Sequence, residues 1–305
     1  MRFSAIETIY NAALKDPKIV FITGDLGHMN TEEFQRNFPG RYFNAGMAEQ
    51  NIIGMAAGMA LLGMKVFVYS IVPFITLRCI EQIKVDVCEQ NLDVTVIGVG
   101  GGLAYGSAGA THYSIEEVGM LRTLPHMKVV VPATPSETKI LTQQLIEQGG
   151  PAYLRIGTGK EVDRPVDYPL TLGKASVIRS GKDVSLISNG TIIDEALRVA
   201  DLLKARGVEV EVINMHTVKP IDAEIVIDRA RTKKGVFTLE EHSVIGGLGG
   251  AVAEVLATVK SRPGVFGIFG INDQWPKQVG SQQYLRKLLG IDAETVAAGI
   301  LNQLS

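Results

Sequence analysis

Short apolar runs rich in β-branched residues alternate with longer helical patterns along most of the chain. The runs indicate buried strands, because a strand covered on both faces is almost continuously apolar. They occupy residues 18–24, 65–70, 94–100, 127–133, 184–190, 208–215, 234–241 and 265–271. Helical patterns lie between them, at residues 4–15, 48–62, 74–90, 136–148, 191–206, 247–260 and 280–289. This alternation predicts an α/β fold of parallel sheets with helices on both faces.

One segment interrupts the alternation near the middle of the chain. Residues 158–172, TGKEVDRPVDYPLTL, combine proline, glycine and charge without apolar periodicity. A chain of 305 residues also exceeds the usual size of a single domain. We therefore expect two doubly wound domains, residues 1–157 and 173–305, joined by a linker at 158–172.

Composition narrows the functional class. Hydrophobic residues make up 46% of the chain and charged residues 20%, which is typical of a soluble globular protein. A formal net charge of −2 argues against binding to nucleic acid or to an anionic membrane. With Cys79 and Cys88 as its two cysteines the chain cannot form a disulfide scaffold, so we expect a reducing, cytoplasmic location. The apolar stretch 51–64 is too short to span a bilayer comfortably.

A single acid begins an otherwise uncharged helical pattern. In FNAGMAEQNIIGMAAGMA, residues 43–60, Glu49 is followed by no charged residue until Lys65. A carboxylate in the first turn of a helix is stabilised by about 0.3–1 kcal/mol in the field of the helix N-terminus. The alternative is that the helix delivers Glu49 to a functional site at its tip.

The glycine-rich stretch IGVGGGLAYGSAGATHYS, residues 97–114, leaves a predicted strand and leads to Thr111 and His112. It matches neither G-x-G-x-x-G nor a Walker loop, so it is a weak candidate for a phosphate loop. Ligands of open α/β sheets bind beyond the carboxyl ends of the strands, which is where this loop would lie. His112 is therefore a candidate functional residue. The other histidines are interpreted as structural: His28, His126, His216 and His242.

Taken together, these segments resemble the C-terminal part of the transketolase family. In the first predicted domain the resemblance rests on AEQNIIGMAAGMA, YSIVPFITLRCIEQIKVD, AGATHYSIEEVGMLRTLPHMKVVVPATPSE and PAYLRIG. In the second it rests on VINMHTVKPID, FTLEEHSVIGGLGGAV and FGINDQW followed by LRKLLGI. These motifs span nearly the whole chain in the family's order. The resemblance implies a pyrimidine-binding domain for thiamine diphosphate, followed by a transketolase C-terminal domain.

The same resemblance implies roles for individual residues. Glu49 would bind N1′ of the cofactor's aminopyrimidine and promote loss of the thiazolium C2 proton, and Phe74 and Arg78 lie in the element that packs on that ring. His112 would act in catalysis and hydrogen-bond the substrate near its carbonyl. Arg155, in the strand PAYLRIG, would bind the phosphate or another terminal anion of the substrate. The implied reaction transfers a two-carbon ketol unit from an anionic ketose to an aldose.

A partner chain is implied as well. The family binds the diphosphate and Mg²⁺ through a Gly-Asp-Gly…Asn motif in an N-terminal domain, whereas here Gly24 and Asp25 are followed by Leu26. We therefore expect no metal ligand in this chain. It resembles the smaller subunit of a split transketolase, with the diphosphate-binding subunit as its partner in an α2β2 heterotetramer.

Other interpretations stay open at this point. The β subunits of 2-oxo acid dehydrogenases share the architecture, 1-deoxyxylulose-5-phosphate synthase is related, and an inactive partner-binding subunit would keep the fold alone. Two positions also depart from the family's pattern: Ala108 stands where an acidic residue is common, and glycines 100–102 stand where many members have a histidine. The donor and acceptor sugars, the kind of anion and the aromatic on the pyrimidine are thus left undetermined.

Overall fold

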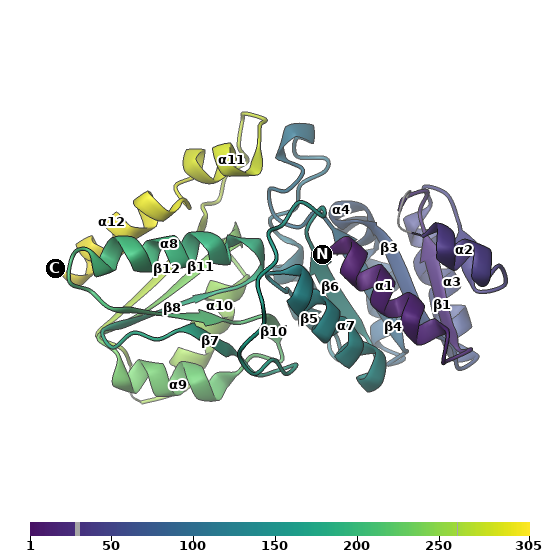
Figure 1. The fold of residues 1–305 in the computed structure, drawn as a ribbon, viewed down its shortest axis with the longest axis horizontal. Helices are drawn as coiled ribbons and strands as arrows, with labels where there is room; N and C mark the ends of the chain where they lie inside the picture. The colour runs from purple at the N-terminus through teal and green to yellow at the C-terminus, as the bar shows by residue number, and fades with distance from the viewer. Residues whose placement is uncertain (28–30, 261) are drawn as a thin grey trace.

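The structure is a computed structural model that describes residues 1–27, 31–260 and 262–305. His28, which we interpret as structural, lies outside these residues. The chain forms two sheets, each covered by helices on both faces (Figure 1). In the described ranges, no helix combines the length and the apolar character needed to cross a bilayer.

The first sheet comprises, within the described residues, seven strands in the order β10-β5-β6-β4-β3-β1-β2. All neighbours are parallel except β10, which pairs antiparallel with β5 at one edge. The strands are β1 (Ile19–Thr23), β2 (Tyr42–Asn44), β3 (Lys65–Ile71), β4 (Val94–Val99), β5 (Lys128–Val130), β6 (Ala152–Ile156) and β10 (Thr217–Lys219).

Two helical layers cover this sheet. One apolar core joins the strands to α1 (Arg2–Ala13), α2 (Glu32–Asn37) and α7 (Pro135–Gln148), with α1 and α7 side by side in Figure 1. The core on the opposite face holds α3 (Glu49–Leu61), α6 (Glu117–Arg122) and the short helices α4 (Val72–Ile75) and α5 (Ile80–Gln82). The small apolar residues of α3, such as Ala56 and Ala57, allow its close packing on the strands.

The second sheet has, in the described part of the chain, five strands in the order β12-β11-β8-β9-β7. They are β7 (Ser176–Arg179), β8 (Val184–Ser188), β9 (Val210–Asn214), β11 (Gly235–Ser243) and β12 (Val265–Ile271). One face carries α8 (Ile193–Lys204), α11 (Gln282–Leu288) and α12 (Ala293–Leu304). The other carries α9 (Ala223–Thr232) and α10 (Leu248–Ala257), and Figure 1 shows α8 and α9 on opposite sides of the sheet.

The predicted α/β fold with two doubly wound units is confirmed, with differences in detail. The edge strands β10 and β7 run antiparallel to their neighbours, and β10 adds to the first sheet although it follows β9 of the second. The helix predicted over 74–90 is broken into α4, a 3-10 turn at Leu77–Cys79, α5 and a π-helical turn at Ile83–Cys88. The Thr76 hydroxyl, which donates to the Val72 carbonyl at 2.6 Å, accompanies the first break.

The ends of the strands bring the two sheets together. At the end of β11, the Ser243 N–H donates to the Ile115 carbonyl at 2.6 Å, in the loop that follows β4. The loop between β4 and α6, residues 100–116, is thereby attached to the second sheet. This contact places the predicted functional loop, which carries His112, at the junction of the two sheets.

We expect His216 to make the folding stability of the chain depend on pH. The side chain is fully buried between β9 and β10, and burial lowers its pKa from 6.5 to about 4, although the Lys174 backbone and Asp222 act in the opposite direction. The unfolded chain therefore binds a proton at a higher pH than the folded chain does, so stability falls as the pH drops from about 6.5 to about 4. The expected loss attributable to His216 is about 3 kcal/mol by pH 4. The measurement is the urea unfolding midpoint of the wild type and of His216→Gln at several pH values in this window. If the midpoints of the two proteins change equally with pH, the prediction is contradicted.

Candidate functional site

Glu49 lies at the first turn of α3, beneath the carboxyl ends of β1 and β3, and its side chain is almost completely buried at 2% exposure. The Ser70 hydroxyl, at the end of β3, donates to Glu49 Oε1 at 3.0 Å. Arg78 Nη1 donates to Oε2 at 2.6 Å. Gly24 lies beside the carboxylate, and a Cβ at that position would lie 3.4 Å from Oε1 and 3.2 Å from the Gly46 carbonyl oxygen. The carboxylate is thus held in a defined orientation at a sheet edge.

A chain of side-chain contacts leads from Glu49 to His112. The Arg78 guanidinium carbon lies 4.7 Å from the centre of the Phe74 ring, a cation–π geometry. The Phe74 and His112 rings meet edge to face, with centroids 5.3 Å apart. His112 Nδ1 lies 2.8 Å from the Thr111 hydroxyl, which orients the imidazole. The structure therefore brings together four of the five predicted site residues, from α3, the broken helix and loop 100–116.

The arrangement has the features of a proton-transfer site. A buried carboxylate can exchange a proton with a ring nitrogen, and Arg78, whose side chain is 46% exposed, is the accessible partner of the ion pair. The adjacent Cys79 is not a candidate nucleophile, because burial, assisted by the charge of Glu49, raises the pKa of its thiol to about 12. Acid–base chemistry at Glu49 and hydrogen bonding by His112 are what these residues can perform.

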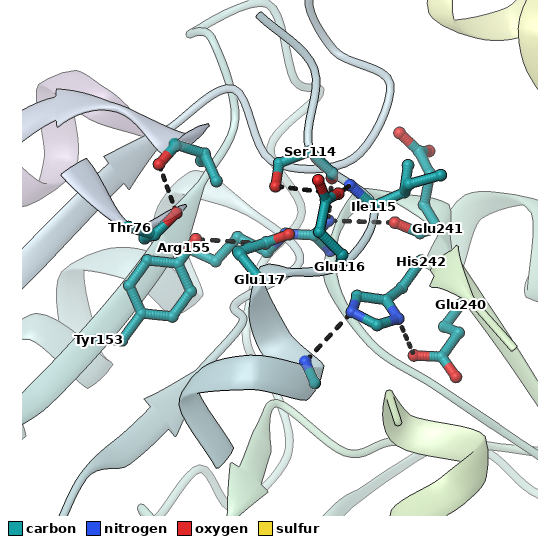
Figure 2. A network of polar contacts seen from close by, with 12 residues as sticks. Thr76, Ser114, Ile115, Glu116, Glu117, Tyr153, Arg155, Glu240, Glu241 and His242 are labelled. Carbon is teal, nitrogen blue, oxygen red and sulfur yellow. Dashed lines mark hydrogen bonds and ion pairs between the residues drawn. The ribbon is translucent and has the colours of Figure 1, made fainter. Parts of the chain in front are cut away.

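Arg155 belongs to a different cluster, at the junction of the two sheets (Figure 2). Its side chain is buried, and Nε forms an ion pair with Glu117 Oε1 at 2.6 Å. Nη2 donates to the carbonyl of Ser114 at 3.2 Å and to that of Glu241 at 3.0 Å. The Tyr153 hydroxyl donates to the same Glu117 oxygen at 3.2 Å. The role of Arg155 as a ligand of the substrate anion stays a prediction, and these contacts support a structural role instead.

The pKa values of Arg155 and Tyr153 are shifted by their burial and by the nearby Glu117 carboxylate. Burial alone would lower the pKa of Arg155, but Glu117 holds it above its ordinary value. The pKa of Tyr153 lies well above its usual value because the phenol is buried and faces Glu117. Both groups therefore keep their protons at any physiological pH.

The same cluster explains the glycine run. A Cβ at Gly101 would lie 2.3 Å from Arg155 Nε, and one at Gly102 would lie 2.5 Å from Glu241 Oε1. Gly100 and Gly102 also have positive φ angles of 79° and 63°. These glycines allow the backbone to pass close to two side chains.

Sequence reasoning missed Ser70 and Glu117 as members of these clusters. Ser70 carries a recognisable signal, because it is a polar residue at the carboxyl end of a buried strand. Glu117 carries none, because nothing in the adjacent pair Glu116 and Glu117 indicates which carboxylate turns inward.

Comparison with sequence models of protein families gives two matches. The transketolase pyrimidine binding domain matches residues 1–160, and the transketolase C-terminal domain matches residues 173–296. The two matches together cover most of the chain.

Individual relatives agree with these matches. One of the subunits of the apulose-4-phosphate transketolase of Phocaeicola vulgatus is 35% identical over 276 residues, which cover 90% of this chain and 88% of the relative. One of the subunits of the 6-deoxy-6-sulfo-D-fructose transketolase of a Clostridium species is 35% identical over 303 residues, covering 97% and 92%. A solved structure described as a split gene transketolase, inactive β4 tetramer, has a TM-score of 0.90 at 33% identity, covering 99% and 97%.

Proposed function

This chain belongs to the transketolase family, and we propose from that premise that it is one subunit of a split, thiamine diphosphate-dependent transketolase. In this proposal the enzyme transfers a two-carbon ketol unit from an anionic ketose to an aldose. The observation that carries the proposal is the chain of contacts from Glu49 through Arg78 and Phe74 to His112. These residues come from three separate elements, so their meeting is a property of the fold.

The surroundings of Glu49 fit the pyrimidine end of thiamine diphosphate. Its carboxylate is buried, whereas its ion-pair partner Arg78 is half exposed, and Gly24 at the end of β1 lies beside it. In the proposed complex Glu49 would hydrogen-bond a pyrimidine nitrogen and hold or transfer a proton there, and Phe74 would pack on the ring. When bound, thiamine diphosphate supplies the carbon nucleophile and the electron sink of the reaction. We propose that the partner subunit holds the diphosphate and Mg²⁺.

His112 is the proposed substrate contact. Thr111 engages Nδ1, so Nε2 can hydrogen-bond a hydroxyl or carbonyl oxygen of the sugar. The named relatives act on sugars with different anionic groups, one a phosphate and one a sulfonate. A donor screen should therefore include ketoses of both kinds. It should also include 2-oxo acids, which separate this function from that of the 2-oxo acid dehydrogenases.

Partner dependence is the second part of the proposal. Both named relatives are subunits, and the structural relative is a split-gene protein described as an inactive β4 tetramer. We propose an α2β2 heterotetramer with a diphosphate-binding subunit. We also propose a cytoplasmic location, in keeping with two free, buried cysteines.

Calorimetry with and without the partner tests this proposal. The isolated chain should not bind thiamine diphosphate and Mg²⁺ tightly, because it provides the pyrimidine contacts alone. The co-expressed complex should bind with a Kd below about 1 µM and should transfer a two-carbon unit from at least one ketose in the screen. Sub-micromolar binding to the isolated chain would contradict partner dependence, and absence of transfer from every ketose would contradict the activity.

A further inference from the structure

Loop 100–116, which carries Thr111 and His112, is attached to the C-terminal half of the chain at both ends. Near its start, the Leu103 N–H donates to Glu241 Oε1 at 2.5 Å. Near its end, the Ile115 carbonyl accepts from the Ser243 N–H at 2.6 Å. Glu241 and Ser243 both lie at the carboxyl end of β11. A single strand of the second sheet therefore holds both ends of the loop.

Glu241 is the centre of this attachment. The carboxylate is buried at 4% exposure, and it accepts three hydrogen bonds and forms an ion pair with Arg286. Oε1 accepts from Leu103 N–H and from Gln282 Nε2 at 2.7 Å. Oε2 accepts from Arg286 Nε at 2.5 Å, and Arg286 Nη2 forms an ion pair with the same oxygen at 2.5 Å. Because these partners are all donors and Arg286 is a cation, a carboxylate satisfies them together, whereas an amide would turn an NH₂ group toward donors.

Arg155 contacts the loop from the side of the first sheet. Its Nη2 bridges the carbonyls of Ser114 and Glu241, so one guanidinium joins the end of the loop to the strand that holds its start (Figure 2). Gly101 and Gly102 pass between Arg155 and the Glu241 carboxylate with no space for a Cβ. The path of the loop is therefore determined by two buried charged side chains, one from each sheet.

We propose that Glu241 is a positioning residue for His112, so that the C-terminal domain fixes the substrate-binding histidine through the ends of its loop. This inference rests on the proposed function for the role of His112. It predicts that loosening the loop affects the steps that need His112 and spares proton exchange at Glu49. Glu49 lies on α3 and is held by Ser70 and Arg78, which do not contact Glu241.

Glu241→Gln is the test, made in the complex with the partner subunit. One orientation of the amide turns its NH₂ group toward the Leu103 and Gln282 donors. The other keeps those two bonds but turns NH₂ toward Arg286 and removes its counter-charge, so the attachment of the loop should weaken. Amide hydrogen exchange of peptides from 100–116 should rise at least about tenfold. The kcat of two-carbon transfer should fall about tenfold to a hundredfold, as misplaced catalytic groups do. Exchange of the C2 proton of bound thiamine diphosphate should stay within about twofold of wild type, since it does not require His112.

Glu211→Gln is the matched control. Glu211 is also a buried carboxylate of the second sheet, bound by Arg229 Nε at 2.6 Å and by the Ser185 hydroxyl at 2.7 Å, away from loop 100–116. It should change global stability without changing loop exchange or transfer. If Glu241→Gln does not fold, Gln282→Ala is the second variant, because it removes one hydrogen bond that a neutral side chain donates to the same carboxylate. It should raise hydrogen exchange in 100–116 and lower kcat by smaller factors than Glu241→Gln.

The outcomes separate this inference from the proposed function. Unchanged hydrogen exchange in 100–116, or equal losses in C2 exchange and transfer, would overturn the positioning role. A wild-type complex that neither exchanges the C2 proton nor transfers a two-carbon unit would overturn the proposed function. Increased hydrogen exchange of the loop in Glu241→Gln would still demonstrate the attachment in that case.

Discussion

Glu49→Gln should lower the turnover of the assembled complex by about two to four orders of magnitude, the range expected when acid–base catalysis is lost. The glutamine keeps the size of the side chain and can still hydrogen-bond the Ser70 hydroxyl. It cannot exchange a proton with a pyrimidine nitrogen. The expected loss of folding free energy is small, about 0.3–1 kcal/mol, because the removed charge lies at a helix N-terminus and its ion-pair partner Arg78 is half exposed.

The measurement is C2-proton exchange of the bound cofactor, which needs no knowledge of the sugar substrates. Glu137→Gln provides a matched control, since Glu137 is also a buried carboxylate in the first turn of a helix, α7. It accepts from the Ala133 N–H at 2.7 Å and lies outside the Glu49 contacts. The control should lose stability and keep wild-type exchange. Wild-type exchange in Glu49→Gln would show instead that Glu49 is only a helix-terminal charge.

The fold could be predicted from the chain where elements are long and periodic. Apolar runs such as VTVIGVG and VSLISNG identify the central strands β4 and β8, because strands buried on both faces leave a continuous signal. The edge strands β2, β7 and β10 have three or four residues each, which is too short to give a comparable apolar pattern. Whether such a strand runs parallel or antiparallel is decided by its neighbour in the sheet, which the local sequence does not reveal. The helix α12 was predictable, since Val296, Ala297 and Ile300 repeat at helical spacing, but our predicted elements end before it.

The candidate site likewise has a part that the sequence predicts and a part that it does not. The family motifs identified Glu49, Phe74, Arg78 and His112, and the structure brings these residues into one chain of contacts. Their catalytic and binding roles remain predictions. For Arg155 the sequence revealed a strand-end cation but not its partner, because Glu117 is its neighbour in space and not in sequence. Long-range ion pairs of this kind have no local signature.

Arg155→Met should destabilise the folded chain by about 3–5 kcal/mol, because it leaves the charge of Glu117 buried without its partner. Glu117 is fully buried, and in the described part of the chain its Oε2 has no hydrogen-bond partner. The carboxylate therefore depends on Arg155 and on the Tyr153 hydroxyl through its other oxygen. Methionine fills a similar length of apolar space, so the charge is the main change.

The role predicted from the family resemblance gives a different result. An arginine that binds the terminal anion of the sugar supplies mostly uniform binding, so its loss raises KM with a smaller effect on kcat. Such an arginine would need donors available to the substrate. Here two of its three nitrogens, Nε and Nη2, are engaged by Glu117 and by two backbone carbonyls. We therefore expect the stability effect to dominate, with any kinetic effect arising from a displaced loop 100–116.

A double-mutant cycle decides between the two roles. Arg155→Met, Glu117→Gln and the double variant are compared by urea unfolding and by KM for phosphorylated and neutral ketoses. If the pair is structural, Glu117→Gln should recover part of the stability lost in Arg155→Met, because it removes the buried charge that the arginine compensated. The discrimination between charged and neutral ketoses should then stay unchanged. A KM raised for the phosphorylated ketose alone, with unfolding midpoints equal to wild type, would restore Arg155 as the ligand of the substrate anion.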